Sequence, residues 1–481
     1  MDYTLYLLAG TLYGFVFGII PIAGATTALL TVYSFMGWFR ADPYSLVVFT
    51  TAVVISASVG DLFASVVMNI PGGGGSAATM VDGFPMARRG EGARALSASI
   101  FSACAQGLIW GMLVFAFLPY YAGIVTYFGI PEMLCFVVLA LTTVTFVNNQ
   151  YWFRGLLGLF LGLFLGHIGT DPVTNAERFT GGWFYLAAGV QILPLMSGLL
   201  AMPEILESLG RPISATPPCD NIIAQMFQGA HDAWKYRWDS IRSGIIGGII
   251  GLLPGIGGAV VDWLAYAQTV AAGRSDVVPF GSGNIRGVVG AEGANMAQKS
   301  TAYIPTILFG VPAAPFEVVI MSLFMYVGLE MGSPALLADP RFFHALNYSF
   351  MISLALTFVL SLVFVRWATY LTRVPVYWYF VPLIALIFWS CAEYTGGWED
   401  YAMLIMCTLV GVVLKYLRIS RACVLIGFVL SPRLELISRQ FSSIYQPQDL
   451  LHHPIALLLL LIAAASIVYG VFFSRTKLNY H

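Results

Sequence analysis

Charged residues are scarce in this 481-residue sequence, and their scarcity excludes several classes of protein. Asp, Glu, Lys and Arg make up 10% of it, the formal net charge is −1, and no segment forms a basic domain. Nucleic-acid binding needs a basic patch or stripe, so we do not expect it here. So few charges also argue against a soluble protein.

Motifs for metal, disulfide and nucleotide chemistry are missing as well. The six cysteines are scattered, with no CxxC or Cys/His spacing, so neither a disulfide framework nor a zinc site is indicated. No Gly-Lys-Ser/Thr follows the glycine run at 72–75, which argues against an ATP site. The six histidines form no catalytic set. We therefore expect a protein that is not an enzyme and that holds no metal centre or organic cofactor.

Apolar residues are what the sequence has in abundance. They make up 58% of it, and the mean hydropathy is +0.81. Each apolar stretch is close to the ~20 residues that span a bilayer as a helix. We predict an all-α integral membrane protein, a polytopic bundle of roughly twelve spans with several broken or re-entrant helices. Residues 1–4 lack the basic region of a signal peptide, so we expect them to be retained in a multi-pass inner (plasma) membrane protein.

One interrupted apolar segment is the main evidence for a binding site within the membrane. Residues 245–270 are long enough to enter a bilayer, but Gly-Leu-Leu-Pro-Gly-Ile-Gly-Gly-Ala interrupts them at 251–259. Proline and clustered glycines stop a helix and leave backbone groups without helical partners. Within a membrane such open backbone is tolerated only inside protein or beside a wet cavity. The break therefore predicts a site for a small ion or solute, and a kinked helix with a packing glycine is the alternative.

A second copy of this pattern favours the site. Gly-Ile-Ile-Pro-Ile-Ala-Gly-Ala stands at 18–25, and a further break at 68–75 matches one at 309–315. The two sets are offset by roughly 235 to 240 residues, and duplicated broken segments are typical of secondary transporters. We divide the chain into a first transmembrane repeat (1–209), a linker (210–240), a second repeat with the C-terminal spans (241–474) and a tail (475–481).

The basic residues predict that the two repeats are inverted. Arg88, Arg89 and Arg94 follow the breaks of the first half, whereas Lys235, Arg237 and Arg242 precede those of the second. Loop 328–340, after the breaks of the second half, contains no Lys or Arg. Because cytoplasmic loops carry the excess of Lys and Arg, the copies should lie in opposite orientation.

Polar residues between the second-half breaks are the first candidates for chemistry. Glu292, Asn295 and Lys299 would share one face of a helix, and charges at membrane depth usually face a cavity. Lys299 would be the countercharge of an anionic substrate, or occupy a cation site and replace the ion. The alternatives are an ion pair with Glu292 or a lysine that snorkels.

Two further carboxylates, Asp61 and Asp262, are candidates with Glu292 for binding a cation or proton, and a structural ion pair or wet helix end is the alternative. Glu317 is expected at a helix N-terminus. Backbone groups at the breaks would make most contacts with substrate or ion. The predicted binding residues are Asn69, Gly72, Gly73, Gly74, Ser76, Pro254, Gly255, Gly257, Asn295, Lys299, Ser300, Pro312 and Ala313.

At these breaks the sequence resembles the large membrane subunit of tripartite tricarboxylate transporters, the TctA family. The order and spacing of several motifs fit, and the likeness spans nearly the whole chain. Each motif alone is weak, but together they are specific. The matching stretches are 70–72 with 82–90, 169–171 with 178–180, 253–258, 292–295, and 303–305 with 310–312.

The resemblance implies ion-driven uptake of small carboxylates such as citrate. It also implies a periplasmic substrate-binding protein that delivers the substrate, a second small membrane subunit, and a coupling sodium ion or proton. The chain departs from the family pattern at Pro21-Ile22-Ala23-Gly24, where Pro-Gly-x-Gly is usual. Met296 replaces the second Asn of an Asn-Asn pair, and Gln298 and Lys299 stand where small residues are usual.

Three other functions stay open at this point. A free-standing carrier for another small anion would need no binding protein, and a channel would need no delivery partner. An intramembrane enzyme acting on lipid-linked or acyl substrates would need a convergent catalytic set at one membrane face, which the sequence does not suggest. The duplication is also unexplained by an enzyme.

Overall fold

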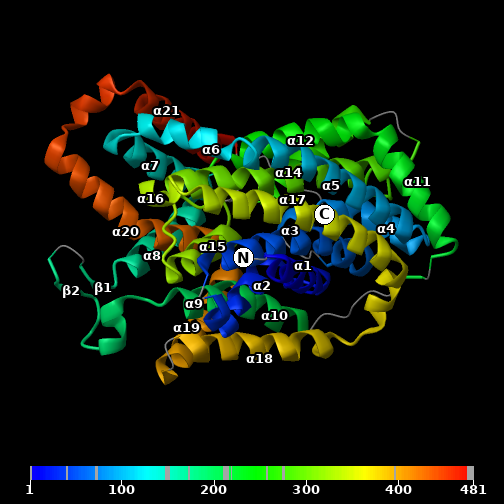
Figure 1. Cartoon of the computed structure of the whole chain (residues 1–481), viewed down its shortest axis with the longest axis horizontal. Helices are drawn as coiled ribbons and strands as arrows, with labels where there is room; N and C mark the ends of the chain where they lie inside the picture. Colours follow the sequence, from blue (N-terminus) through cyan, green and yellow to red (C-terminus); the bar gives the residue numbers. More distant parts are fainter. Residues whose placement is uncertain are drawn as a thin grey trace.

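The computed structural model describes an almost entirely helical chain (Figure 1). In the part of the chain that the structure describes, the strands form one short antiparallel hairpin, which pairs β1 (Gly169–Thr170) with β2 (Glu177–Arg178). The residues described are 3–39, 42–70, 74–146, 152–171, 174–209, 216–217, 219–255, 258–273, 277–394 and 397–473.

The helices of the first half and the linker run in chain order as follows: α1 (Thr4–Ile19), α2 (Gly24–Thr31), α3 (Pro43–Met68), α4 (Thr79–Arg88), α5 (Gly92–Phe115), α6 (Leu118–Tyr121), α7 (Ile130–Phe146), α8 (Trp152–Gly166), α9 (Ile192–Met196), α10 (Met202–Leu209) and α11 (Ile222–Lys235). Those of the second half are α12 (Arg237–Gly251), α13 (Gly258–Ala272), α14 (Ile285–Phe309), α15 (Pro315–Tyr326), α16 (Pro334–Leu337), α17 (Pro340–Phe364), α18 (Val376–Tyr394), α19 (Trp398–Tyr416), α20 (Arg421–Ile444) and α21 (Pro454–Val468). The predicted linker thus contains a helix of its own, α11.

Among the described residues, five helical segments are long and apolar enough to cross a bilayer: 43–68, 92–115, 192–209, 340–371 and 454–472. Five shorter apolar helices accompany them, so an all-α membrane protein fits the fold, and the number of spans stays a prediction. Helix α20 continues to Ile444, because Pro432 lies within the helix without ending it.

The N-terminal segment is a hairpin that turns at its break. Gly10, Gly14 and Gly18 bring α1 so close to α3 that a Cβ on Gly14 would lie 2.4 Å from the carbonyl oxygen of Val53. The three glycines meet α3 in increasing sequence order, so the two helices run parallel. Between them the chain turns back, and the Tyr13 hydroxyl lies 2.5 Å from the Thr31 hydroxyl of α2. Helices α1 and α2 thus form a hairpin and not one bent span.

The second half repeats this arrangement. A Cβ on Gly247 of α12 would lie 2.2 Å from the Ala294 carbonyl oxygen of α14, and one on Gly251 would lie 2.6 Å from that of Gln298. Gly247 and Gly251 meet α14 in increasing sequence order, so α12 runs parallel to α14. The chain turns back as α13, which packs against both helices. Each half therefore builds a hairpin on one long, buried helix.

The two halves are interleaved around these long helices. We call α1–α4 the first hairpin unit and α12–α16 the second. Helix α5, which follows the first unit, packs on α14, and α17, which follows the second unit, packs on α3. The Phe115 and Phe350 rings, 4.3 Å apart, join α5 to α17 in the core. A lateral group (α7, α8, α20 and α21) and another (α9, α10, α18 and α19) flank this centre (Figure 1).

Candidate functional site

The broken segments of the two halves share unusual backbone conformations. Ile22 and Gly255 each follow the proline of a hairpin break, and their φ angles are +69° and +85°. Asn69 and Gly310 each follow a long helix, α3 or α14, and their φ angles are +58° and +60°. Left-handed backbone ends a helix in a turn whose N–H groups bond back to its last carbonyl groups, as Ile70 does to Ala64 at 3.4 Å and Val311 to Pro305 at 3.3 Å. The same turn therefore ends the corresponding helix at corresponding places in both halves.

The first pair of breaks joins the end of α3 to the hairpin of the second half. A Cβ on Gly75 would lie 2.2 Å from Asn295 Oδ1, and one on Gly258 would lie 3.4 Å from the Cα of Gly75. The backbone N–H of Ala78 donates to Asp262 Oδ2 at 2.7 Å. Side chains from α13 and α14 therefore lie directly against the open backbone that follows α3.

The other two breaks lie together elsewhere. Helix α15 packs against α2 of the first hairpin, and Tyr33 and Ser322 join the two segments through their hydroxyls, 2.6 Å apart. As expected, Glu317 lies in the first turn of a helix, where Oε2 accepts from the N–H groups of Ala313 at 2.6 Å and Ala314 at 3.1 Å. Glu317 thus satisfies two backbone N–H groups of this second pair of breaks, and its Oε1 has no hydrogen-bond partner among the described residues.

Four ionisable side chains lie buried beside the first pair of breaks. Lys299 Nζ lies 3.9 Å from Asp61 Oδ2, and Lys299 also interacts electrostatically with Glu292 and Asp262. Lys299 is 7% exposed and the three carboxylates at most 2%, so the lysine does not snorkel to the surface. One ammonium against three carboxylates leaves an excess of negative charge if all are ionised.

Hydrogen bonds satisfy only part of this cluster. Glu292 accepts from the Thr79 hydroxyl and from Asn295 Nδ2 at 3.3 Å, which confirms that Glu292 and Asn295 share a helix face. Several buried atoms have no hydrogen-bond partner among the described residues, namely Oδ1 of Asp61, Asp262 and Asn295, and Nε2 of Gln298. Buried polar atoms without a partner are costly unless a ligand or water completes their hydrogen bonds.

The structure does not bring all the predicted binding residues together. Gly74 and Ser76 form a short 3₁₀ turn beside α13 and α14, at the cluster. The Ser300 hydroxyl donates to Met296 of its own helix at 2.9 Å. The Pro254 carbonyl accepts from the Thr143 hydroxyl, and a Cβ on Gly255 would meet α7. Asn69 caps α3.

Two further predicted residues, Pro312 and Ala313, belong to the second pair of breaks. Gly310, just before them, lies about 16 Å beyond Lys299 along α14 at 1.5 Å per residue. Gly72, Gly73 and Gly257 lie outside the described residues. Among those described, no three His, Cys, Asp or Glu side chains are placed to hold a metal ion.

Thr79 and Ala78 are functional candidates that sequence reasoning missed, because neither is charged and their partners lie far away in sequence. Asp82, the first residue of the motif at 82–90, organises the arginine-rich end of the bundle. Its Oδ1 accepts from the N–H groups of Gly281, Gly283 and Asn284 at 2.8–2.9 Å. Its Oδ2 accepts from the Tyr266 hydroxyl at 2.9 Å. Asp82 thereby holds the turn that starts α14.

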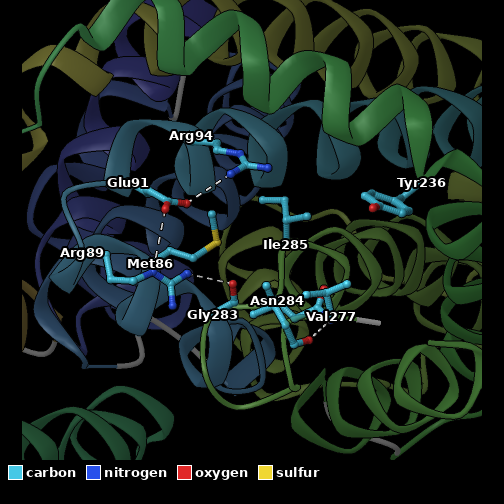
Figure 2. Close-up of a pocket in the computed structure, with 10 residues that line it drawn as sticks. Met86, Arg89, Glu91, Arg94, Tyr236, Val277, Gly283, Asn284 and Ile285 are labelled. Atoms are coloured by element: carbon cyan, nitrogen blue, oxygen red, sulfur yellow. Dashed lines mark hydrogen bonds and ion pairs between the residues drawn. The ribbon is translucent and has the colours of Figure 1, made fainter. Parts of the chain in front are cut away.

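A cavity of about 490 Å³ opens beside this turn. Figure 2 shows Arg89 and Arg94 on either side of Glu91, with Nη1 of Arg94 3.2 Å and Nε of Arg89 3.8 Å from its carboxylate. Arg89 also donates to the carbonyl oxygens of Ser282 and Gly283. This network ties the end of the first hairpin unit to the start of α14, and its basic residues are those predicted to face the cytoplasm.

The decisive comparison is with protein families. Residues 4–426 match the tripartite tricarboxylate transporter TctA family. The chain belongs to this family. The resemblance that the sequence motifs suggested is thus confirmed, and this TctA-family protein is a component of a membrane transporter.

Two curated relatives, both from Agrobacterium vitis, are similar to the TctA-family chain. An uncharacterized 52.8 kDa protein in the TAR-I ttuC' 3'region is 27% identical over 469 residues, which cover 97% of this chain and 92% of the relative. An uncharacterized protein in the TAR-II ttuC' 3'region is 30% identical over 190 residues, 39% of this chain and 78% of that relative. No solved structure matches the chain.

Proposed function

We propose that this protein is the large transmembrane subunit of a binding-protein-dependent secondary transporter that imports small carboxylates across the inner membrane. The observation that carries the proposal is the buried cluster of Asp61, Asp262, Glu292, Asn295 and Lys299 beside the first pair of breaks. Ionisable residues at membrane depth that meet around open backbone are typical of substrate and ion pathways. Alternating access would expose this site to each side of the membrane in turn.

Inverted repeats would provide the two states. The start of α3 lies by the loop that follows the second-half breaks, since the Tyr44 hydroxyl donates to Asp339. Beyond the other end of α3, Asp82 binds the start of α14. The start of α3 thus lies near the loop that follows the second-half breaks, and its end lies near the start of α14. This favours opposite directions for the two hairpin units, which is also what the distribution of basic residues predicts. Rocking one repeat against the other around a fixed site is a common route to alternating access.

Coupling to a cation follows from the charges. With its single ammonium, the cluster is negative unless protons or a cation enter. The unpartnered oxygens of Asp61, Asp262 and Asn295 would bind sodium together with open backbone carbonyls, or a carboxylate would take up a proton. Once the negative charge is offset, Lys299 and the N–H groups around Gly74–Ser76 would attract a substrate carboxylate.

The partners follow from the family. A tripartite transporter of this family has a periplasmic substrate-binding protein and a small membrane subunit beside the large one, and we propose both for this chain. The binding protein would deliver the carboxylate to the face away from Arg88, Arg89 and Arg94, because those arginines mark the cytoplasmic side.

Uptake into proteoliposomes tests the proposal. Radiolabelled di- and tricarboxylates would be supplied with and without the two partner proteins, under a sodium or a proton gradient. We expect uptake only with the binding protein and with one gradient, and loss of uptake in Asp61→Asn. Asp449→Asn, a change at a partly exposed position outside the cluster, should transport like wild type. Uptake without a binding protein would indicate a free-standing carrier, and no gradient-driven carboxylate uptake would overturn the proposal.

A further inference from the structure

A second candidate site lies at the arginine-rich end of the bundle, away from the buried cluster. A crevice of about 890 Å³ separates the start of α11 from the end of α17. Ile222, Ile223 and Met226 line one wall, and Leu362 and Val363 line the other. Among the described residues that line it, Arg366 alone is charged. The crevice is thus an apolar slot with a single positive charge at its rim.

The arginine has a free guanidinium group. Arg366 is exposed and lies 3.9 Å above the ring of its neighbour Trp367. In the part of the chain that the structure describes, it forms no ion pair or hydrogen bond. An arginine on an aromatic ring keeps its N–H groups available for a phosphate, which a guanidinium binds in bidentate fashion.

The helix that forms one wall has the character of an interfacial helix. Ile223, Phe227, Trp234 and the following Trp238 recur at helical spacing and are 60–74% exposed. The opposite face packs on α5, where a Cβ on Gly229 would lie 2.3 Å from the Arg94 carbonyl oxygen. In Figure 1, α11 lies at one end of the bundle and turns steeply away from the direction of α12. An exposed stripe of this kind suits the boundary between headgroups and acyl chains.

Basic residues follow the stripe closely. Lys235 lies at the end of α11, and the Arg237 guanidinium lies 5.0 Å from the ring of Trp234. Basic residues on the cytoplasmic side of a membrane protein attract acidic lipids, by ~1 kcal/mol each near the surface. Apolar walls, exposed aromatic side chains and unpaired positive charge therefore all fit one ligand, a phospholipid with a net negative headgroup.

We propose that the crevice between α11 and α17 binds an anionic phospholipid of the cytoplasmic leaflet. Its phosphate lies on Arg366, and an acyl chain follows Ile223 and Val363. Because α11 joins the two halves and α17 packs on α3, the lipid would hold the linker against the core of the bundle. The proposal does not depend on which solute is transported.

The chain contains its own probe for this site. Cys219 lines the crevice and is partly exposed, whereas the other five cysteines are buried. Maleimide labelling of the intact protein in detergent should therefore report on Cys219, with Cys219→Ser as the blank. We expect phosphatidylglycerol to slow labelling at concentrations where phosphatidylcholine does not. Equal effects of the two lipids, or equal protection by inorganic phosphate alone, would overturn the proposal.

Variants separate specific binding from a general effect of lipid. Arg366→Gln should require about fivefold more phosphatidylglycerol for the same protection, since one arginine–phosphate contact is lost. The matched control is Arg418→Gln, another exposed arginine, which should behave like wild type. Ala224→Trp should fill the crevice and remove the phosphatidylglycerol bound in native mass spectra. Unchanged lipid dependence in both Arg366→Gln and Ala224→Trp would contradict the site.

Discussion

Ile22 and Gly255 occupy corresponding places in the two halves, and both have a left-handed backbone. Each follows the proline at the tip of a hairpin, Pro21 or Pro254. Glycine adopts this conformation without strain, whereas a β-branched residue does so rarely. The first half therefore forms the same turn as the second with a residue poorly suited to it.

The strain at Ile22 predicts that glycine stabilises the protein more than alanine does at this position, the reverse of the usual order within a helix. Both Ile22→Gly and Ile22→Ala remove the side chain, but only glycine relieves the left-handed strain, which costs other residues ~1–2 kcal/mol. We expect the glycine variant to unfold at a higher temperature than the alanine variant. At Ala105, an exposed position within α5, glycine should instead be less stable than alanine by about 0.5–1 kcal/mol. Thermal unfolding in detergent compares the two sites.

The contact between Lys299 and Asp61 predicts energetic coupling. Lys299→Met leaves buried carboxylates without their cation, which typically costs about 3–5 kcal/mol. Adding Asp61→Asn should recover part of this loss, with a coupling of about 1–3 kcal/mol in a double-mutant cycle. Additive effects of the two changes would mean that the two charges do not interact. Unfolding in detergent at fixed pH measures each corner of the cycle.

Lys299 also predicts a change in ion dependence. If the ammonium group occupies the place of a cation, then Lys299→Ala should make uptake depend on sodium, or depend on it more steeply. The measurement is initial uptake in proteoliposomes across a series of sodium concentrations at fixed pH. Identical sodium dependence of uptake in wild type and Lys299→Ala would show that the lysine does not occupy a cation site.

Glu317 predicts a stability effect at the second pair of breaks. Its Oε2 accepts from Ala313, Ala314 and the Thr306 hydroxyl. Glu317→Ala leaves buried donors unsatisfied, at about 1–3 kcal/mol for each group that water does not reach. Glu317→Gln keeps an acceptor oxygen and should lose less. Equal melting temperatures for the two variants would show that the acceptor is dispensable.

Asp82 predicts a local rather than a global effect. Replacing it with alanine removes the acceptor for the N–H groups of Gly281, Gly283 and Asn284, so the turn before α14 should open more often. We expect amide hydrogen exchange there to accelerate about tenfold or more, since 1.4 kcal/mol is a factor of ten in an equilibrium constant. Exchange in the first turns of α3, at the opposite end of that helix from Asp82, serves as the internal control and should not change.

Sequence alone determined the class of the protein and the positions of its breaks. Hydrophobicity is summed along the chain, and the effect of proline and glycine on a helix is local, so both can be read without contacts. The repeat was visible for the same reason, because Pro21 and Pro254 stand in matching surroundings. The shared face of Glu292 and Asn295 required only the period of a helix.

Tertiary structure alone decided which breaks and charges meet. Asp262 lies 184 residues from Ala78 in sequence, and no local pattern relates a carboxylate to an N–H group so distant. The same holds for Asp61 with Lys299, and for the separation of Pro312 and Ala313 from the cluster. These relationships depend on how the helices of the two halves pack together, with α5 on α14 and α17 on α3. Such packing depends on the shapes of whole helices, so the candidate site exists only in the folded chain.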